Sequence, residues 1–447
     1  MAPLEEADVG RRVERKLLLR IASLVFLLYF SFAIDRGNIG FAALQMNAAL
    51  GLSAEVFGFG SGLFTLAYLL FQAPNAEMLR RLGPRRGFAL VACGWGLVST
   101  STAFVPDQTW FLVNRFALGV SEAGFHAFII YYISTIFPQR ICGFAVGISF
   151  VAVPFSMIVA SPLSGVLLDV EWGTFAGWQS LFIIEGVPSI LLGLLCLKLV
   201  PDTVRDMRFL SPAERSWLEQ ELGEMETRSA QASLGANIVR VLANPVVWAL
   251  GLVLLTMVLA VNVMTIWMPL MIRQVSGAGN LTVGVLNSLP WIAFSIGCVL
   301  ASRMSDKASN RATPLRASVA LATVGFLVCA ALQEVNTPFA FAMFLLACVG
   351  AGGAQGSFWA LAMSLMSGVT AAAAFAMITV IGNGSGVIAH PLIGRMHDAT
   401  GSFSGVVWTL AAFYVAAFGV LHWIVRRRHP LRSDGSAPLQ RDAVEER

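Results

Sequence analysis

The sequence predicts an all-α membrane protein with twelve transmembrane helices in two pseudo-symmetric six-helix bundles. Of its 447 residues, 57% are hydrophobic and 13% are charged, whereas soluble domains average about 45–50% apolar and about 25% charged residues. About twelve apolar runs reach the length of roughly 20 residues that a bilayer-spanning helix needs. A short motif occurs once in each half of the chain, which indicates a duplicated architecture.

The chain divides into five segments at its polar interruptions. Residues 1–20 are predicted as a cytoplasmic N-terminal tail, without the cleavage site of a removable signal peptide. Residues 21–200 hold six apolar runs, centred near 28, 65, 95, 120, 155 and 190, and form the predicted N-terminal bundle. Residues 246–425 hold six more, centred near 257, 292, 324, 347, 381 and 415, and residues 426–447 form a cytoplasmic tail.

The longest polar interruption, residues 201–245, is predicted as a cytoplasmic central loop that contains a short amphipathic helix. In "LSPAERSWLEQEL", Ser211, Pro212 and Glu214 have the pattern of an N-cap, a proline at the first helical position and a capping-box acid. Basic residues gather in this loop, at both ends of the chain and in alternate short loops. The positive-inside rule therefore places both termini in the cytoplasm. We expect a multi-pass protein of the cytoplasmic (inner) membrane.

The repeated motif supports two related halves. "PLSGVLLD" begins at Pro162 and "PLIGRMHD" begins at Pro391, an offset of 391 − 162 = 229 residues. The basic loop at 79–86 has a counterpart at 305–312, an offset of 226 residues. Both offsets are near half the chain length. Duplicated halves are typical of secondary transporters, which bind their substrate near the bilayer midplane.

Charged residues inside the apolar runs are the candidate functional groups. Asp35 and Arg36 lie in "FAIDRGNIGF", and Arg115 and Glu122 lie in "NRFALGVSEAGFH". A charge at the centre of a spanning helix costs about 2.5–3.5 kcal/mol on insertion scales. Seven residues are nearly two helical turns, so Arg115 and Glu122 should share one face about 10 Å apart. His126, four residues further on, is expected on the same face.

Structural readings of these residues remain open at this point. Asp35 and Arg36 could form a structural pair at the membrane edge, and Arg115 could extend its guanidinium toward the interface. His126 could be a packed core histidine. On the other reading, acids and cations on one face line a water-filled path, which suits the binding of an anion and the carriage of a proton.

Other polar residues give weaker signals. Glu185 precedes a proline closely and could serve either packing or transport, and His390 could serve the pathway or bond backbone groups that Pro391 leaves free. The five histidines are scattered without metal-ligand spacing, and the six cysteines lie in apolar runs without a CxxC pattern. We therefore expect no metal, no cofactor, no disulfide and no enzyme activity.

Seven segments together carry a family resemblance: "DRGNIGFAALQMNAALGLS" (35–53), "NRFALGVSEAGF" (114–125), "GWQSLFIIEGVPSILLG" (177–193), "VPDTVRDMRFLSPAERSWLEQEL" (200–222), "IWMPLMIRQVSG" (266–277), "SRMSD" (302–306) and "GNGSGVIAHPLIGRMHDATGSFS" (382–404). From about residue 17 to residue 425 the chain resembles a major facilitator superfamily transporter of the anion:cation symporter family. That family includes carriers of tartrate, hexuronates, sugar acids, phthalate and hydroxyphenylacetate.

The resemblance implies roles for the intramembrane charges. Asp35 and Glu122 match the acids that carry the coupling proton. Arg36 and Arg115 match the arginines that hold the substrate carboxylate, a role that the guanidinium fork suits.

Further substrate-binding positions follow from the same resemblance. Tyr68 matches an aromatic residue on the second helix, and Trp359 matches a tryptophan near the cavity on the tenth. Thr379 stands where the family usually has asparagine on the eleventh helix, and Asn383 lies one turn later. His126 departs from the usual phenylalanine. Such departures indicate a pocket of altered polarity, so the family's sugar-acid substrates are not transferred to this chain, and an aromatic acid or a polyhydroxy acid is the expected cargo.

A set of charged residues near the cytoplasmic side is expected to act in gating. It comprises Arg80, Arg81 and Arg85 in the first half and Asp306 in the second. Arg80 stands where the family normally has an acid, and Glu77, one turn earlier, could take that acid's place.

The sequence thus predicts a proton-coupled symporter that imports a small organic carboxylate by alternating access. The alternative is a proton-driven efflux antiporter of an organic anion with the same fold. The expected partners are the small anion, protons and the lipid bilayer; nucleic acid is not expected, and the protein is expected to be a monomer.

Overall fold

The computed structural model describes residues 3–229, 241–307, 310, 312–366 and 371–426. Within these residues, twelve helical spans are long and apolar enough to cross a membrane. Every predicted span centre lies inside one of them, so the predicted number and positions of the membrane helices are confirmed. The domain boundaries and the cytoplasmic orientation of the termini stay predictions.

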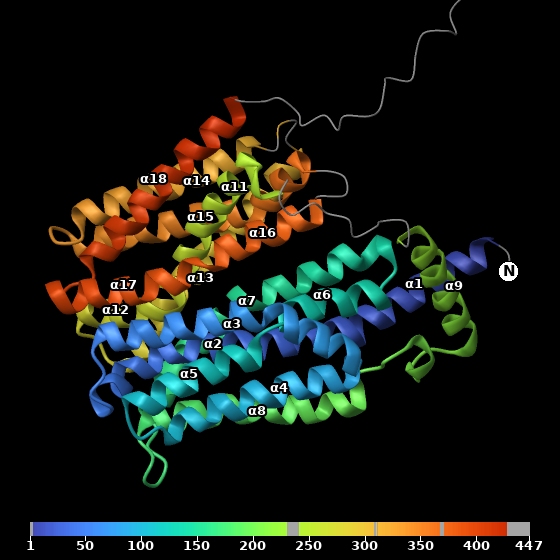
Figure 1. Cartoon of the computed structure of the whole chain (residues 1–447), viewed down its shortest axis with the longest axis horizontal. Coiled ribbons are helices and arrows are strands. Elements are labelled where there is room, and N and C mark those ends of the chain that lie inside the picture. Colours follow the sequence, from blue (N-terminus) through green and yellow to red (C-terminus); the bar gives the residue numbers. More distant parts are fainter. Residues whose placement is uncertain (1–2, 230–240, 308–309, 311, 367–370, 427–447) are drawn as a thin grey trace, which may run out of the picture.

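The helices form two bundles that lie side by side (Figure 1). The first contains α2 (Ser23–Ala49), α3 (Ala54–Leu82), α4 (Pro84–Ser101), α5 (Gln108–Glu122), α6 (Phe125–Ile136), α7 (Gln139–Leu167) and α8 (Gly177–Leu199). The second contains α11 (Pro245–Asn262), α12 (Met268–Ser276), α13 (Asn280–Lys307), α14 (Ala312–Leu332), α15 (Thr337–Leu365), α16 (Ala371–Asn383), α17 (Ser385–Thr400) and α18 (Ser404–Arg426). Each bundle has six spans because α5 with α6, α11 with α12, and α16 with α17 each make one.

The fourth span is not one continuous helix, which corrects the expected position of His126. Helix α5 ends at Glu122, and α6 begins at Phe125. Between them Gly124 has a φ of 87°, a left-handed conformation that favours glycine. A Cβ on Gly124 would also lie 2.6 Å from the Ala76 backbone nitrogen of α3. The break redirects the chain, so His126 does not continue the face that carries Glu122.

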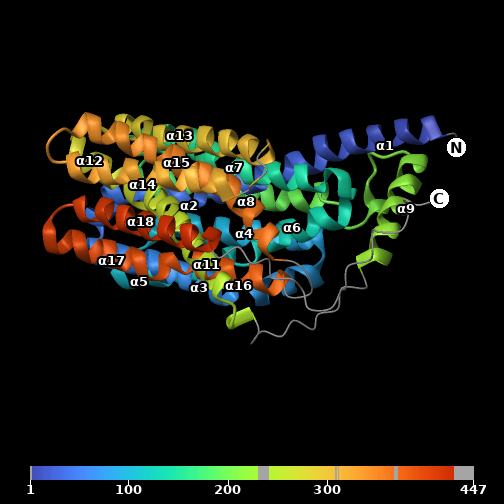
Figure 2. The ribbon, with the colours of Figure 1, turned by 90° about the horizontal axis from the view of Figure 1, so that it is seen from above.

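The first membrane helix extends far beyond the bundle (Figure 2). Helix α1 (Pro3–Leu17) continues through a π-helical turn, Leu18–Ala22, into α2. Helix α9 (Pro212–Ser229), from the central loop, packs beside α1. The predicted capping box is present, because Glu214 N donates to Ser211 Oγ at 3.3 Å and Ser211 N donates to Glu214 Oε2 at 2.8 Å.

The contact between α1 and α9 should weaken in acid. Lys16 Nζ donates to both carboxylate oxygens of Glu214, at 2.8 and 2.7 Å. Burial alone would raise the pKa of Glu214, but the hydrogen bonds from Lys16 and Ser211 outweigh it, so the pKa lies below its ordinary value. A lowered folded-state pKa means that the contact stabilises docking above the ordinary glutamate pKa and loses this effect as the pH falls through the lowered value.

Amide hydrogen exchange in α9, corrected for its intrinsic pH dependence, should therefore rise below about pH 4. Glu214→Gln should show about tenfold faster exchange already at neutral pH, because a charge-assisted pair is lost. Glu219→Gln, on the same helix but in an exposed pair with Arg205, is the matched control. Equal exchange in the two variants would contradict the assignment.

The two bundles are joined at the end of the molecule where α2 finishes and α3 begins, which we call the sealed end. In Figure 1 their ribbons lie together there and diverge toward the end that carries α9. On one side of the seal, Asn280 Nδ2 at the start of α13 donates to Asp169 Oδ1 at 2.6 Å. About two turns deeper, Asn287 Nδ2 donates to Ser161 Oγ at 3.0 Å.

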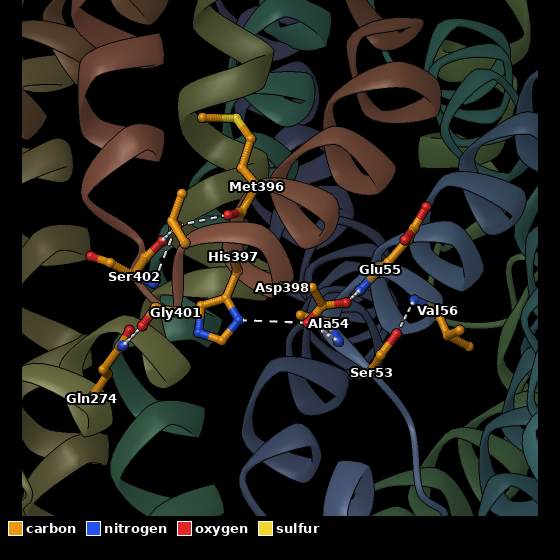
Figure 3. Close-up of polar contacts among 11 residues, drawn as sticks. Ser53, Ala54, Glu55, Val56, Gln274, Met396, His397, Asp398, Gly401 and Ser402 are labelled. Carbon is orange, nitrogen blue, oxygen red and sulfur yellow. Dashed lines mark hydrogen bonds and ion pairs between the residues drawn. The ribbon is translucent and has the colours of Figure 1, made fainter.

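The other side of the seal is formed by the second copy of the repeated motif. The Asp398 carboxylate of α17 accepts hydrogen bonds from the backbone nitrogens of Ala54 (3.1 Å) and Glu55 (2.8 Å), at the start of α3 (Figure 3). Asp398 thereby satisfies free amides at a helix N-terminus, where a negative charge is stabilising. Asp169 and Asp398 are the last residues of the two motif copies, so the duplication places equivalent aspartates at the two contacts that close this end.

Glycines let the helix backbones touch at the seal. A Cβ on Gly58 of α3 would lie 2.2 Å from the His390 carbonyl oxygen of α17, and one on Gly284 of α13 would lie 2.4 Å from the Ser161 carbonyl oxygen of α7. Both distances are shorter than a carbon–oxygen contact allows. A side chain at either position therefore forces the bundles apart.

Gly58→Ala should open the sealed end. Thr65 lines a cavity between the two bundles. In a variant without the native cysteines, a cysteine at Thr65 should react about tenfold faster with an impermeant thiol reagent added from the sealed end. Gly143→Ala on α7, where a Cβ meets open space, is the control. Unchanged Thr65→Cys reactivity in the Gly58→Ala background would show that this contact does not close the end.

Candidate functional site

A cavity of about 170 Å³ lies between the bundles. From the first bundle, four predicted site residues with charged side chains line this cavity: Asp35, Arg36, Arg115 and Glu122. Tyr68 also lines it. The second bundle contributes neutral polar groups and aliphatic side chains, the polar ones being Asn262, Thr265, Asn383 and His390. The cavity therefore has a charged wall on one side and an uncharged hydrogen-bonding wall on the other.

An ion pair dominates the charged wall. Arg36 Nε of α2 donates to Glu122 Oε2 of α5 at 2.8 Å. The Glu122 side chain is fully buried, whereas 33% of the Arg36 side chain is exposed. Glu122 is the last residue of α5, where the helix dipole contributes partial negative charge. A cationic partner is therefore needed at this position, and Arg36 supplies it.

Aromatic rings hold the Arg36 guanidinium in place. Its central carbon lies 4.5 Å from the ring centroids of Phe32 and Tyr68 and 5.2 Å from that of Phe64. Rings at such distances attract a cation through their π faces. Arg36 Nη2 has no hydrogen-bond partner among the described residues, and neither has Glu122 Oε1. The pair thus keeps one unused donor and one unused acceptor in a buried site.

Asp35 points to a different set of partners. Ser99 Oγ of α4 donates to its Oδ1 at 2.7 Å, and Ser189 Oγ of α8 donates to its Oδ2 at 2.9 Å. Asn38 Nδ2, one turn along α2, lies 3.4 Å from Oδ1. The residue is 1% exposed. Asp35 is consequently a buried carboxyl held by neutral donors rather than by an ion pair with its neighbour Arg36.

Arg115 is held by polar groups of the 3₁₀ turn after α4 (Thr102–Phe104) and of its own helix, α5. Its Nη2 lies 3.2 Å from Thr102 Oγ1 and 3.1 Å from Asn114 Oδ1. The residue is 3% exposed, and its Nε has no partner among the described residues. Arg115 therefore contributes positive charge to the cavity wall from a more enclosed position than Arg36.

On the opposite wall, the polar groups are oriented by their neighbours. Trp267 Nε1 donates to His390 Nδ1 at 3.1 Å, which leaves Nε2 as the protonated nitrogen of a neutral His390 ring. Asn262 Nδ2 lies 3.5 Å from Ser385 Oγ. Neutral donors and acceptors of this kind suit hydroxyl or carbonyl groups of a ligand.

Three predicted binding residues do not line the cavity in this arrangement. His126 Nδ1 is 2.5 Å from the Tyr29 hydroxyl, behind the wall that Tyr29 forms. Trp359 stacks edge-on with Phe358 and Phe375, and the Thr379 hydroxyl donates to a backbone carbonyl of its own helix. Their part in substrate binding stays a prediction.

The predicted gating residues form separate clusters. Arg80 and Arg81 each donate to Glu77 at 2.7 Å, so Glu77 does pair with the arginine that replaces the family acid. Arg85 lies 3.7 Å from Asp202. Asp306 belongs to α13, but its side chain lies outside the described part of the chain. The gating role of these four residues stays a prediction.

Several cavity residues were not on the predicted list. Asn262 and His390 had a usable signal, because a polar side chain within an apolar run is costly and is usually retained for function. Ser61 and Thr65 had none, since small hydroxyl residues are common in membrane helices, where they bond their own backbone, as both do here.

Comparison with known proteins agrees with this architecture. The family model described as Major Facilitator Superfamily matches residues 25–390. A protein of Agrobacterium vitis named "Putative tartrate transporter" is 36% identical over 97% of this chain and 99% of its own length. A "Quinolone resistance transporter" of Acinetobacter baumannii is 32% identical over 93% of this chain and 94% of its own.

Solved structures show the same fold. The inward-open structure of the xylose transporter XylE from E. coli has a TM-score of 0.73 at 15% identity. The match covers 90% of this chain and 95% of the XylE chain. A bacterial homologue of the human lysosomal transporter Spinster, inward-facing and occupied, has a TM-score of 0.70 at 17% identity. It covers 91% of this chain and 96% of its own.

Proposed function

This chain belongs to the major facilitator superfamily, and from that premise we propose that it imports a small organic carboxylate together with protons. Members of the superfamily are transporters rather than enzymes. The chain is accordingly a multi-pass transporter of the inner membrane, with twelve apolar spans among the described residues.

The observation that carries the proposal is the Arg36–Glu122 ion pair at the cavity wall. A substrate carboxylate and the Glu122 carboxylate compete for the same guanidinium, which is 2.8 Å from Glu122. Protonation of Glu122 removes the competitor and frees Arg36 for the incoming anion. Loss of that proton restores the ion pair and displaces the anion, so proton and substrate travel together.

Charge balance supports the same coupling. With Asp35 and Glu122 ionised, two negative charges offset the two positive charges of Arg36 and Arg115. An anion added to this neutral, buried group would be an uncompensated charge, which is expensive to bury. Each proton taken up by an acid offsets one negative charge of the substrate. The site therefore favours entry of the anion with at least one proton.

The two walls of the cavity narrow the substrate class. A carboxylate fits against Arg36, while the rest of the molecule faces the neutral groups Asn262, Thr265 and Asn383. A small hydroxylated carboxylate meets both walls. Because the relative of Agrobacterium vitis carries tartrate in its name, tartrate is the first compound to test.

The test is uptake into proteoliposomes with an imposed pH gradient. With the outside acidic, labelled tartrate or another small carboxylate should accumulate inside, and a protonophore should abolish the accumulation. A screen of carboxylic acids by thermal shift selects the substrate beforehand, because a bound ligand stabilises the native state. A carboxylate that binds and crosses the membrane without any response to the pH gradient would refute proton coupling.

An efflux antiporter is the second candidate, favoured by the similarity to the quinolone resistance transporter. An antiporter exchanges the anion for protons, so the same acid-outside gradient would drive the anion out of the vesicle. The sign of the response to one gradient, in vesicles of known protein orientation, thus discriminates import from efflux.

A further inference from the structure

His390 lines the cavity from the second bundle but has no part in the mechanism above. It lies on α17 and is 1% exposed. Its Nδ1 accepts a hydrogen bond from Trp267 Nε1 at 3.1 Å, so this nitrogen does not serve a backbone group that Pro391 leaves free. A neutral ring that accepts at Nδ1 carries its proton on Nε2. His390 therefore has one donor left, Nε2–H, in a residue that lines the cavity.

The Trp267 ring is itself held in place, so it can fix the ring of His390. Trp267 is 0% exposed and ends the π-helical turn Val263–Trp267, a type of turn that is frequent at functional sites. Phe57 of α3 contacts it edge-on, with 5.3 Å between ring centroids, and the ring centroid of Phe403 lies 5.8 Å away. Trp267 thus orients the imidazole and selects its tautomer.

The backbone of His390 is held as closely as its ring. A Cβ on Gly58 of α3 would lie 2.2 Å from the His390 carbonyl oxygen, so α17 packs directly against the first bundle at this residue. A polar group whose rotamer is fixed by packing and by a second hydrogen bond suits selective recognition. Little further ordering is needed when a ligand binds to it.

The charge of the ring narrows the group that it can bind. Trp267 can donate only to an unprotonated Nδ1, so the hydrogen bond holds His390 in its neutral form. Arg36 and Arg115 supply positive charge on the opposite wall. A carboxylate is better matched by a guanidinium. The neutral N–H of His390 is therefore suited to an uncharged oxygen acceptor, a hydroxyl or a carbonyl.

We propose that His390 is a specificity-determining residue whose Nε2–H donates to a hydroxyl or carbonyl oxygen of the substrate, and that Trp267 positions it. The inference rests on the proposed function and narrows its substrate class to carboxylates that carry such an oxygen away from the group held by Arg36. An analogue without that oxygen leaves the N–H unpaired, and a site of this kind rejects it. Trp267 is not among the described residues that line the cavity, so it acts through His390.

The test compares the binding of tartrate with that of succinate, which has the same two carboxylates but no hydroxyl groups. Calorimetry on the wild-type protein should give at least about tenfold tighter binding of tartrate. His390→Phe keeps a ring but no donor, so this preference should fall by about tenfold. The fall should come from weaker tartrate binding, with succinate affinity within about twofold of wild type. His390→Gln, whose amide can still donate, should keep most of the preference.

Trp267→Phe tests the positioning role. It lets the His390 ring turn, so the preference for tartrate should fall by about threefold. In the His390→Phe background the same change should alter the preference by less than about twofold, because Trp267 acts only through His390. That double variant also removes the buried indole N–H that His390→Phe leaves without an acceptor, so it should fold where the single variant does not. Trp291→Phe, on α13 and also buried, is the matched control.

An unchanged preference for tartrate in both His390→Phe and the double variant would overturn the inference. So would a wild-type protein that binds succinate as tightly as tartrate, or whose bound carboxylates all lack a hydroxyl or carbonyl oxygen. Where the thermal-shift screen selects another hydroxylated carboxylate, that compound and its deoxy analogue take the place of tartrate and succinate. These outcomes leave the proposed function intact, because carboxylates still bind. A wild-type protein that binds no small carboxylate would instead refute the proposed function.

Discussion

Glu122→Gln should abolish proton-driven accumulation of the substrate while leaving exchange of one substrate molecule for another. Glutamine cannot take up or release the coupling proton, and it does not compete with the substrate as an anion for Arg36. Each coupled proton supports about tenfold accumulation per pH unit of gradient, so wild-type vesicles under two units should reach about a hundredfold ratio for one proton. The variant should equilibrate at a ratio near one.

Counterflow separates this effect from misfolding. Vesicles preloaded with unlabelled substrate should still take up labelled substrate in Glu122→Gln, because exchange needs binding and reorientation but no net proton movement. Glu122→Asp keeps an acid at the same place and should retain some accumulation. Normal concentrative uptake by Glu122→Gln would remove Glu122 from the proton path.

Loss of the Arg36 guanidinium should cost most of the substrate affinity. A buried charge-paired group typically contributes about 2–5 kcal/mol when truncated, so Arg36→Met should weaken binding by about two orders of magnitude or more. The same change leaves Glu122 as an unpaired buried acid, which costs about 3–5 kcal/mol if the acid stays ionised. A direct comparison of binding would therefore be confounded by unfolding.

The double variant Arg36→Met with Glu122→Gln separates the loss of substrate binding from the loss of stability. It should regain much of the thermal stability that Arg36→Met loses, yet it should still bind the carboxylate poorly in calorimetry. Glu122→Gln alone is its matched control and should bind well. Arg115→Ala should weaken binding less than Arg36→Met, because Arg115 is already engaged by Thr102 and Asn114. Full affinity in the double variant would place the anion elsewhere.

The fold was predictable from the sequence because it depends on apolar length. Each span is set by a run of about 20 hydrophobic residues, and all twelve predicted centres fall inside helices. The repeat was predictable from the two copies of one motif, those at Pro162 and Pro391. The role of the repeat in closing one end of the molecule was not predictable, because the contact of Asp398 with the start of α3 joins residues more than 340 positions apart.

The charged wall of the cavity was also predictable, because unpaired charges in apolar runs are rare. The pairing of these charged residues was not predictable. Helical periodicity grouped Glu122 with Arg115 and His126, whereas the structure pairs it with Arg36 of α2. For His126 the periodicity failed because the left-handed Gly124 lies between the end of α5 and the start of α6. A single glycine in an apolar run does not reveal that conformation.

The uncharged wall was the hardest part to predict. Thr265 is an ordinary residue for a membrane helix, and only the approach of the two bundles makes it a cavity residue. Asn383, which also lines the cavity, was expected only from the family resemblance. A site formed between two bundles depends on their relative position, which local sequence patterns do not encode.

The continuous helical rod from Pro3 to Ala49 allows reorientation of the first bundle to be measured during transport. At 1.5 Å per residue it is about 70 Å long, more than twice the thickness of the hydrocarbon layer. A tilt of the first bundle by about ten degrees would move the N-terminal tip of the rod by roughly 12 Å on that length. A fluorophore attached near Asp8, paired with one on α18, should therefore report each reorientation as a change in energy transfer, without any label in the cavity.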